Sequence, residues 1–258
     1  KRRSGAIYMK KISVFNLKGG IGKTTTCLIL SNLLAQDKKV LLIDMDAANS
    51  LTSFFVDDAD TILNRTVLEG LLGTVDPNDI IINVKDNFSF IPADIGLSEQ
   101  VIHTGDLATL NLSKMLKKIH GFDYVVLDCP PHRLLETRQA LSVSNVIITP
   151  TTLDKWSTRS LDMVERFLQE IDEVRENTQE QLEHHFILPT MFDKQQKLQN
   201  MFLENLKSDY GDKVLPPISR RADVLKFVAL GDVSMVDRLE AFNEHKPLLN
   251  AIKGMVTA

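Results

Sequence analysis

Short apolar runs alternate along the chain with longer segments whose apolar residues recur every three or four positions. The runs predict strands at 12–15, 40–43, 88–91, 124–127, 146–148 and 186–188. The run at 124–127 is apolar on both faces, as is typical of a strand in the middle of a parallel sheet. Helical patterns lie between the strands, at 24–36, 107–120, 133–142, 157–177, 194–208 and 236–253.

This alternation predicts a doubly wound α/β fold, with a mostly parallel sheet and helices on both faces, because parallel strands need crossover connections. A length of 258 residues suits one large domain or two small ones, and we favour a single domain over 9–258. In such folds ligands bind beyond the carboxyl ends of the strands. The positions that follow each strand are therefore where chemistry is expected.

Composition restricts the choice of partners and of compartment. Thirty Lys and Arg against thirty-four Asp and Glu give a net charge of −4, which excludes coating of nucleic acid by bulk charge and leaves only a local DNA patch. Cys27 and Cys129 are too isolated for a disulfide framework or a metal knuckle, so a reducing compartment is expected. The sequence shows neither a membrane-length apolar run nor a signal-peptide pattern, and we expect a cytoplasmic protein. Residues 1–8 are expected to be an added remnant or the end of a natural extension, without a function.

The most informative stretch is a glycine loop between the first strand and the first helix, Lys18-Gly19-Gly20-Ile21-Gly22-Lys23-Thr24-Thr25. The usual phosphate loop, G-x-x-x-x-G-K-[ST], would need glycine at position 17, where Leu17 stands. The glycines still let backbone N–H groups turn toward an anion, Lys23 supplies a positive charge, and Thr24 offers a hydroxyl for Mg²⁺. Lys18 is an additional lysine that the ordinary loop lacks.

Carboxylates follow two further strands, in Asp44-Met45-Asp46 and Asp128-Cys129-Pro130-Pro131. Both groups should lie where the glycine loop opens, because the carboxyl ends of parallel strands meet. An aspartate that closes an apolar strand can hold Mg²⁺ through a water, which suits Asp128. Asp46 is the candidate for positioning a hydrolytic water, and is also a possible metal group. For Asp44 a catalytic role and a structural cap stay equally open.

These three motifs, in this order, resemble those of the deviant Walker A family of partition ATPases, ParA and its relatives, in the short form without an N-terminal helix-turn-helix domain. The resemblance runs from about Lys10 to the last helix. It implies that ATP and Mg²⁺ drive a sandwich homodimer in which Lys18 of one subunit reaches the phosphates held by the other. It also implies that Lys23 contacts the β and γ phosphates, that Thr24 and Asp128 serve the metal, and that Asp46 orients the attacking water.

The same resemblance implies a base site and a DNA surface late in the chain. Adenine would lie between Thr190-Met191 and Ile218-Ser219. Non-specific DNA would bind basic residues, namely Arg220, Arg221 and Lys226, with Lys194 and Lys197 as additions. The alternative for this group is a solvated face that is ion-paired to Asp223, Asp232 or Asp237.

The sequence also departs from the family pattern. Ala47-Ala48 stands where a Pro-Gln pair is usual, Thr152 and Asp154 replace Gln and Glu, and Ser219 replaces a proline. These changes affect the switch loop and the expected dimer contacts, whereas the phosphate loop itself is retained.

The resemblance predicts a nucleoid-associated DNA-segregation ATPase that is stimulated by a ParB-type centromere-binding partner. A MinD-like membrane-surface ATPase would need a basic amphipathic tail, but residues 248–258 contain one lysine and no aromatic anchor. An ATPase that positions another cargo, a small-molecule ligase, and a reductase with an iron–sulfur cluster are further alternatives. Cys27 and Cys129 lie inside the nucleotide motifs, which disfavours a bridging cluster.

Overall fold

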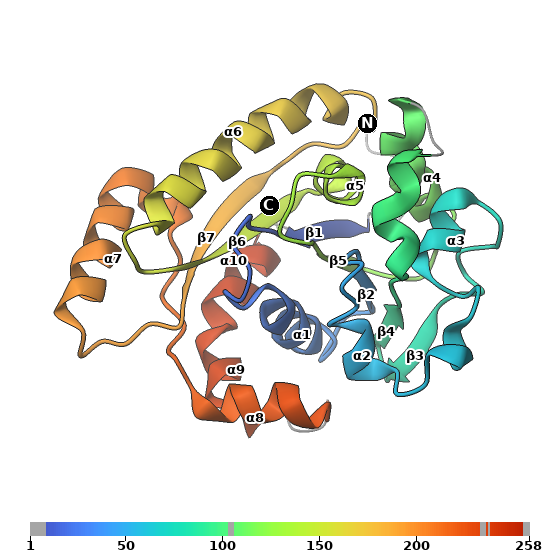
Figure 1. The fold of residues 1–258 in the computed structure, drawn as a ribbon. Coiled ribbons are helices and arrows are strands. Elements are labelled where there is room, and N and C mark those ends of the chain that lie inside the picture. The colour runs from blue at the N-terminus through green and yellow to red at the C-terminus, as the bar shows by residue number, and fades with distance from the viewer. Residues whose placement is uncertain (1–8, 103–105, 233–235, 237, 255–258) are drawn as a thin grey trace.

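The computed structural model describes residues 9–102, 106–232, 236 and 238–254. Residues 1–8 and the end of the tail, 255–258, lie outside this part, as does Asp237. The described chain forms a seven-stranded sheet in the order β3-β4-β2-β5-β1-β6-β7 (Figure 1). The strands are β1 Lys10–Val14, β2 Val40–Asp44, β3 Ile82–Lys85, β4 Phe88–Ile91, β5 Tyr124–Asp128, β6 Val146–Thr152 and β7 His184–Thr190.

The pairing of the strands confirms the predicted doubly wound, mostly parallel sheet. All neighbouring strands are parallel except β3 and β4, which form an antiparallel pair with an irregular register between Asn83 and Lys85. Beyond β7, the segment 214–219 follows the strand, with backbone hydrogen bonds from Leu215 to Ile187 and from Ile218 to Pro189.

Helices cover both faces of the sheet (Figure 1). They are α1 Lys23–Leu34, α2 Thr52–Phe55, α3 Val67–Leu72, α4 Asn111–Leu116, α5 Leu135–Val143, α6 Ser157–Arg175, α7 Lys197–Tyr210, α8 Ala222–Leu230, α9 Glu240–Glu244 and α10 Lys246–Gly254. Short 3-10 turns occupy 59–62, 95–102, 106–110 and 211–213. None of these helices combines the length and the apolar character needed to cross a bilayer.

The core has two layers because successive strand residues point to opposite faces of the sheet. Leu42 and Val126 belong to the layer that packs against α1, α9 and α10. Their neighbours Leu41 and Val125 belong to the layer under α4, α5 and α6. Residues alternating in this way in β2 and β5 are fully buried, which explains why these strands are apolar throughout.

Several predicted boundaries were wrong. The helix expected at 107–120 begins as a 3-10 turn and ends as α4 at Leu116. The helix expected at 236–253 is divided into α9 and α10, because Leu239 is extended and His245 separates the two helices. The strand β3 and the helices α2, α3 and α8 were not predicted at all. The elements β3, α2 and α3 have only four to six residues, too few to show a clear hydrophobic periodicity, and in α8 only Phe227 is buried.

Candidate active site

The glycine loop connects β1 to α1 at the carboxyl edge of the sheet. Gly20 and Gly22 have φ angles of 69° and 91°, in the left-handed region that residues with a side chain rarely adopt. Gly22 is the N-cap of α1, and no side chain caps this helix. The first N–H groups of α1 are therefore available at the loop, where the helix dipole also favours an anion.

Lys23 lies in the first turn of α1 and is buried. Its Nζ donates to the backbone oxygen of Lys18 at 3.1 Å. Burial lowers the pKa of Lys23, and the nearby charges of Asp128 and Asp46 oppose that shift. The structure thus brings these two carboxylates from different strands into the electrostatic neighbourhood of one lysine.

The additional lysine, Lys18, is held by the loop that follows β6. Its Nζ lies 2.6 Å from Asp154 Oδ2 and 2.9 Å from Thr152 Oγ1. Partial burial works to raise the pKa of Asp154, but hydrogen bonds from Lys18 and Thr152 outweigh it and keep that pKa low. Thr152 and Asp154, which replace the usual Gln and Glu, therefore engage Lys18 within the same chain.

Asp44 and Asp128 close neighbouring strands and face each other in register. Asp128 is almost fully buried and accepts hydrogen bonds from the Thr24 hydroxyl and, at 3.6 Å, from Cys27 Sγ. Burial raises the pKa of Asp128 to about 6, with the Thr24 hydrogen bond and the charge of Lys23 acting against it. A hydroxyl and a carboxylate that lie together in this way are suitable ligands for Mg²⁺.

The side chain of Asp44 is fully occupied by protein contacts. Its Oδ2 accepts from the N–H and the hydroxyl of Thr52, at 2.8 and 2.7 Å, and its Oδ1 accepts from Asp46 N–H at 3.0 Å. Burial, followed by the nearby Asp128 charge, raises its pKa to about 8. These contacts match the structural alternative for Asp44, because they tie the end of β2 to α2 and to the backbone of Asp46.

Asp46 begins the loop after β2 and is half-buried. Its Oδ1 accepts from Ala48 N–H at 2.9 Å, and its backbone oxygen accepts from Asn49 N–H at 2.9 Å. Asn49 has a φ of 56°, so the segment turns tightly there without the usual Pro-Gln pair. The structure brings Lys23, Thr24, Asp46 and Asp128 together as the sequence predicts.

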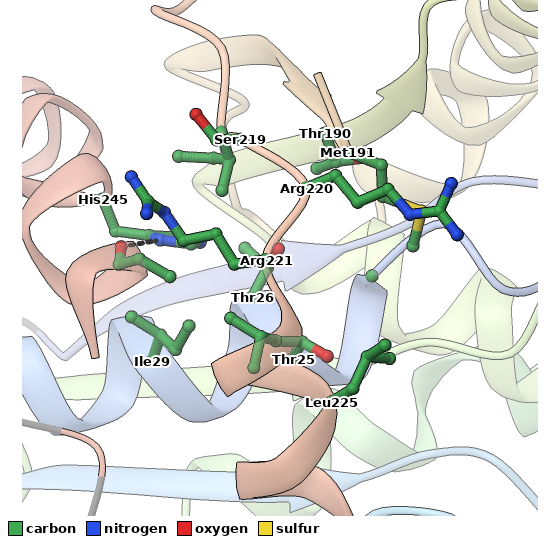
Figure 2. Close-up of a pocket in the computed structure, with 14 residues that line it drawn as sticks. Thr25, Thr26, Ile29, Thr190, Met191, Ser219, Arg220, Arg221, Leu225 and His245 are labelled. Carbon is green, nitrogen blue, oxygen red and sulfur yellow. Dashed lines mark hydrogen bonds between the residues drawn. The ribbon is translucent and has the colours of Figure 1, made fainter. Parts of the chain in front are cut away.

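A cavity of about 160 Å³ lies beside the glycine loop and the start of α1 (Figure 2). Its wall contains the four residues predicted for the adenine site, Thr190, Met191, Ile218 and Ser219. Sequence reasoning missed other lining residues, among them Thr26, Ile29, Leu225 and His245. No signal in the sequence marks them, since they belong to three separate helices or helix ends and form no motif.

A carboxylate on α9 fixes the outer wall of this cavity. Glu244 accepts from Ser219 N–H at 2.9 Å, from Ser219 Oγ at 2.8 Å and from Arg221 Nη2 at 2.8 Å. Arg221 Nη1 donates to Glu240. Arg221, predicted to bind DNA, is thus ion-paired to these glutamates, whereas the sequence suggested aspartates, one of which, Asp237, lies outside the described residues.

The other basic residues of the predicted DNA surface are exposed, namely Lys194, Lys197, Arg220 and Lys226. Backbone hydrogen bonds from Phe192 to Ile218 and from Arg220 to Phe192 place the two loops side by side. Figure 2 shows the Arg220 side chain extending away from that of Arg221. Both arginines line the cavity, but Arg221 is ion-paired to two glutamates, whereas Arg220 belongs to a small group of exposed cations.

Comparison with known proteins agrees with this geometry. A family model described as an AAA domain matches residues 9–184. The chain is 30% identical over 220 residues to the sporulation initiation inhibitor protein Soj of Bacillus subtilis, covering 82% of this chain and 84% of that protein. The chain belongs to the ParA/Soj family of P-loop partition ATPases. Another relative is the maintenance of carboxysome distribution protein A of Gloeothece citriformis, 29% identical over 64% of this chain and 66% of that protein.

Solved structures share the fold of this ParA/Soj family member. A plasmid partition protein from Borrelia burgdorferi B31, bound to AMPPNP, has a TM-score of 0.80 and 29% identity, over 92% of this chain and 98% of that one. Cobyrinic acid a,c-diamide synthase from Mycobacterium smegmatis, with bound ADP and magnesium, has a TM-score of 0.73 and 26% identity, over 89% and 93% of the two chains. The fold thus occurs both in partition proteins and in a biosynthetic enzyme.

Proposed function

We propose that this chain is a partition ATPase that hydrolyses ATP to ADP and phosphate with Mg²⁺, slowly alone and faster with a ParB-type partner. The observation that carries the proposal is the convergence of Lys18, Lys23, Asp46 and Asp128 at the carboxyl edge of the sheet. The biosynthetic relative has a TM-score of 0.73 over 89% of this chain, whereas the plasmid partition protein has a TM-score of 0.80 over 92% of it.

The residues present fit a magnesium nucleotide. The uncapped start of α1 and the buried Lys23 suit the phosphates, while Thr24 and Asp128 suit the metal. Bound Mg²⁺ would neutralise negative charge on the phosphates during transfer. The adjacent cavity, with Thr190 and Ser219 in its wall, suits the base.

Asp46 is the group proposed to orient the attacking water. Its half-buried carboxylate lies in the charge environment of Lys23, and its backbone N–H is fixed by Asp44. Asp44 then acts as a positioning residue. In this reading, Asp46→Ala retains ATP and keeps the protein in its ATP-bound, DNA-attached form.

A homodimer with ATP at its interface would change the partners of Lys18. In the single chain Lys18 is neutralised by Asp154, and it must leave that carboxylate to reach phosphates held by a second copy. Trp156 lies beside this ion pair, since its backbone N–H donates to Asp154 Oδ1 at 2.9 Å, and 60% of its surface is exposed. A large exposed aromatic at this position supports burial by a partner.

The exposed cations around Arg220 and Lys226 are the proposed DNA surface. With a net charge of −4, the chain would bind DNA through this patch and not through its overall charge. The protein would then be cytoplasmic and associated with the nucleoid. Each phosphate neutralised should contribute a slope of roughly 0.9 in log affinity against log salt.

The test is binding to a random-sequence DNA duplex with ATP, with ADP and without nucleotide, across a salt series. We expect binding that needs ATP and weakens with salt, and that weakens further in the double variant Arg220→Ala, Lys226→Ala. Lys117→Ala is the matched control, because Lys117 is exposed at the end of α4 on the opposite face of the sheet. Absence of binding with every nucleotide would contradict the DNA role, and sedimentation with liposomes would then test a membrane-surface role.

The carboxysome-distribution relative supports a second candidate, an ATPase that positions a protein cargo. DNA binding does not by itself identify the cargo, so a positive result in that assay does not separate the two candidates. The separating measurement is ATP hydrolysis with a centromere-binding protein or with a cargo-associated protein added. Stimulation by the centromere-binding protein supports partition, and stimulation by the cargo-associated protein supports the alternative.

A further inference from the structure

The cavity beside α1 contains a histidine whose outer ring nitrogen has no partner. His245, between α9 and α10, is 2% exposed, and its Nδ1 lies 2.7 Å from the backbone oxygen of Ala241. A carbonyl oxygen can only accept, so Nδ1 carries the proton. Burial lowers the pKa of His245, which favours the neutral ring and leaves Nε2 as an acceptor. Within the described chain, Nε2 is buried without a hydrogen-bond partner.

Arg221 presents the opposite kind of group in the same cavity wall. Its two terminal nitrogens are bound by Glu240 and Glu244. Its Nε, which can only donate, is buried and has no hydrogen-bond partner among the residues that the structure describes. In Figure 2 the His245 ring and the Arg221 side chain both lie toward the cavity. The wall therefore offers one unused acceptor and one unused donor.

Buried polar atoms without partners are rare in folded proteins, since each lost hydrogen bond is unfavourable. A ligand that supplies the missing donor and acceptor would satisfy both atoms. Adenine has this pair on one edge, with an exocyclic amino group as donor next to a ring nitrogen as acceptor. Guanine has a carbonyl oxygen at the 6-position. This oxygen is an acceptor and would face another acceptor, His245 Nε2, so no hydrogen bond could form between them.

We propose that His245 is a specificity-determining residue that accepts a hydrogen bond from the 6-amino group of adenine, while Arg221 Nε donates to the neighbouring ring nitrogen. This inference rests on the proposed function, in which the cavity holds the base of ATP. Glu244, the residue directly before His245 in the chain, supports the arrangement because it accepts hydrogen bonds from both Ser219 and Arg221. The base would thus be recognised from the C-terminal helices, opposite the loop that holds the phosphates.

The test uses the full chain and compares three triphosphates by equilibrium binding. ATP carries the 6-amino group, purine riboside triphosphate has hydrogen there, and inosine triphosphate has a carbonyl oxygen. We expect the wild type to bind ATP about tenfold more tightly than purine riboside triphosphate, the value of one buried hydrogen bond, and inosine triphosphate more weakly still. In His245→Leu the preference for ATP over purine riboside triphosphate should fall to near unity, and in His245→Gln, which retains an acceptor, it should partly persist.

His184→Leu is the control, since His184 is an exposed histidine on β7 and should leave every affinity unchanged. Equal binding of ATP and purine riboside triphosphate by the wild type would overturn the inference while leaving the proposed function intact. Equal loss of both affinities in His245→Leu would also overturn it, because the residue would then only shape the cavity. Failure of the wild type to bind any of the three would overturn the proposed function itself. If His245→Leu does not fold, the wild-type comparison of the three nucleotides still decides.

Discussion

The proposed phosphate side and the proposed base side of the site are built in different ways. On the phosphate side, Lys18 to Thr24 form one continuous segment of loop and helix start, Asp128 closes β5, and Asp46 lies two residues after β2. On the base side, Ser219 and Arg221 are held by glutamates 19 to 25 positions further along the chain. One side is therefore set by backbone geometry within short motifs, and the other by side chains that meet only after folding.

This difference decides what each side can tolerate. A glycine loop at the start of a helix presents backbone N–H groups that do not depend on particular side chains elsewhere in the protein. The base-side wall depends on individual side-chain hydrogen bonds, each of which one substitution can remove. Changes on the phosphate side should therefore affect catalysis, and changes on the base side should affect affinity and local stability.

The largest effect is expected for Lys18→Ala. Partner-stimulated ATP hydrolysis should fall by about 10³-fold, the value typical of a charged finger supplied across an interface, whereas ATP affinity should change little. Lys117→Ala, at an exposed lysine that follows α4 on the opposite face of the sheet from α1, is the control. The measurement is the turnover of ATP with a saturating concentration of the partner protein. Normal turnover in the Lys18 variant would contradict the proposal that Lys18 acts across the subunit interface.

Glu244→Ala tests the base side. The change leaves Ser219 N–H and Arg221 Nη2 without their acceptor, so we expect a loss of about 2 kcal/mol in the free energy of unfolding. The affinity for ATP should fall by roughly tenfold while phosphate-side contacts persist. Glu204→Ala, at an exposed pair with Lys207, should cost almost nothing. Denaturant titration and equilibrium ATP binding measure the two effects, and an unchanged affinity would show that this wall does not contact the base.

Thr52→Val tests how firmly Asp44 holds the loop of Asp46. Valine has nearly the same shape as threonine but lacks the hydroxyl that donates to Asp44 and accepts from Ala93 N–H at 2.8 Å. We expect a loss of about 1–2 kcal/mol in the free energy of unfolding and slower ATP hydrolysis. Thr61→Val, on the exposed turn at 59–62, should change neither quantity strongly. Full activity in the Thr52 variant would argue against Asp44 as a positioning residue.

Glu165 lies outside both the phosphate side and the base side, so Glu165→Gln should have the smallest effect on the site. The close approach of His185, whose Nδ1 is 3.2 Å away, is the main reason that the pKa of Glu165 falls to about 2. A carboxyl with a lowered pKa stabilises the fold above about pH 4.5 and loses that contribution as the pH falls toward 2. The variant should be about 1 kcal/mol less stable at pH 7 and equal to the wild type near pH 2.

Urea unfolding at pH 7, 4 and 2.5 checks this dependence. A stability difference that stays constant with pH would contradict the ionic origin of the effect. The affinity for ATP should be the same in the Glu165 variant and the wild type. A change in ATP affinity would show that the sheet core and the site are coupled.

The same contrast explains how much could be predicted from the sequence. The parallel sheet and the cluster of Lys23, Thr24, Asp46 and Asp128 were predictable, because strand ends and glycine loops have fixed spatial consequences. The contacts of Arg221 with Glu240 and Glu244 were not, because they depend on how α9 packs against the loop before α8. The ion pair of Lys18 with Asp154 was also missed, since the two residues are 136 positions apart.

The two borders of the sheet make growth by strand addition unfavourable. Next to β7 runs the segment 214–219, which contains Pro216 and Pro217 and so lacks two of the N–H groups that a further strand would need. At the other border β3 has four residues, an irregular register and a terminal lysine, Lys85. Edge strands that are short, irregular or contain proline protect sheets from pairing edge to edge and aggregating. Any assembly of copies of this chain should therefore use surfaces other than the two borders of the sheet.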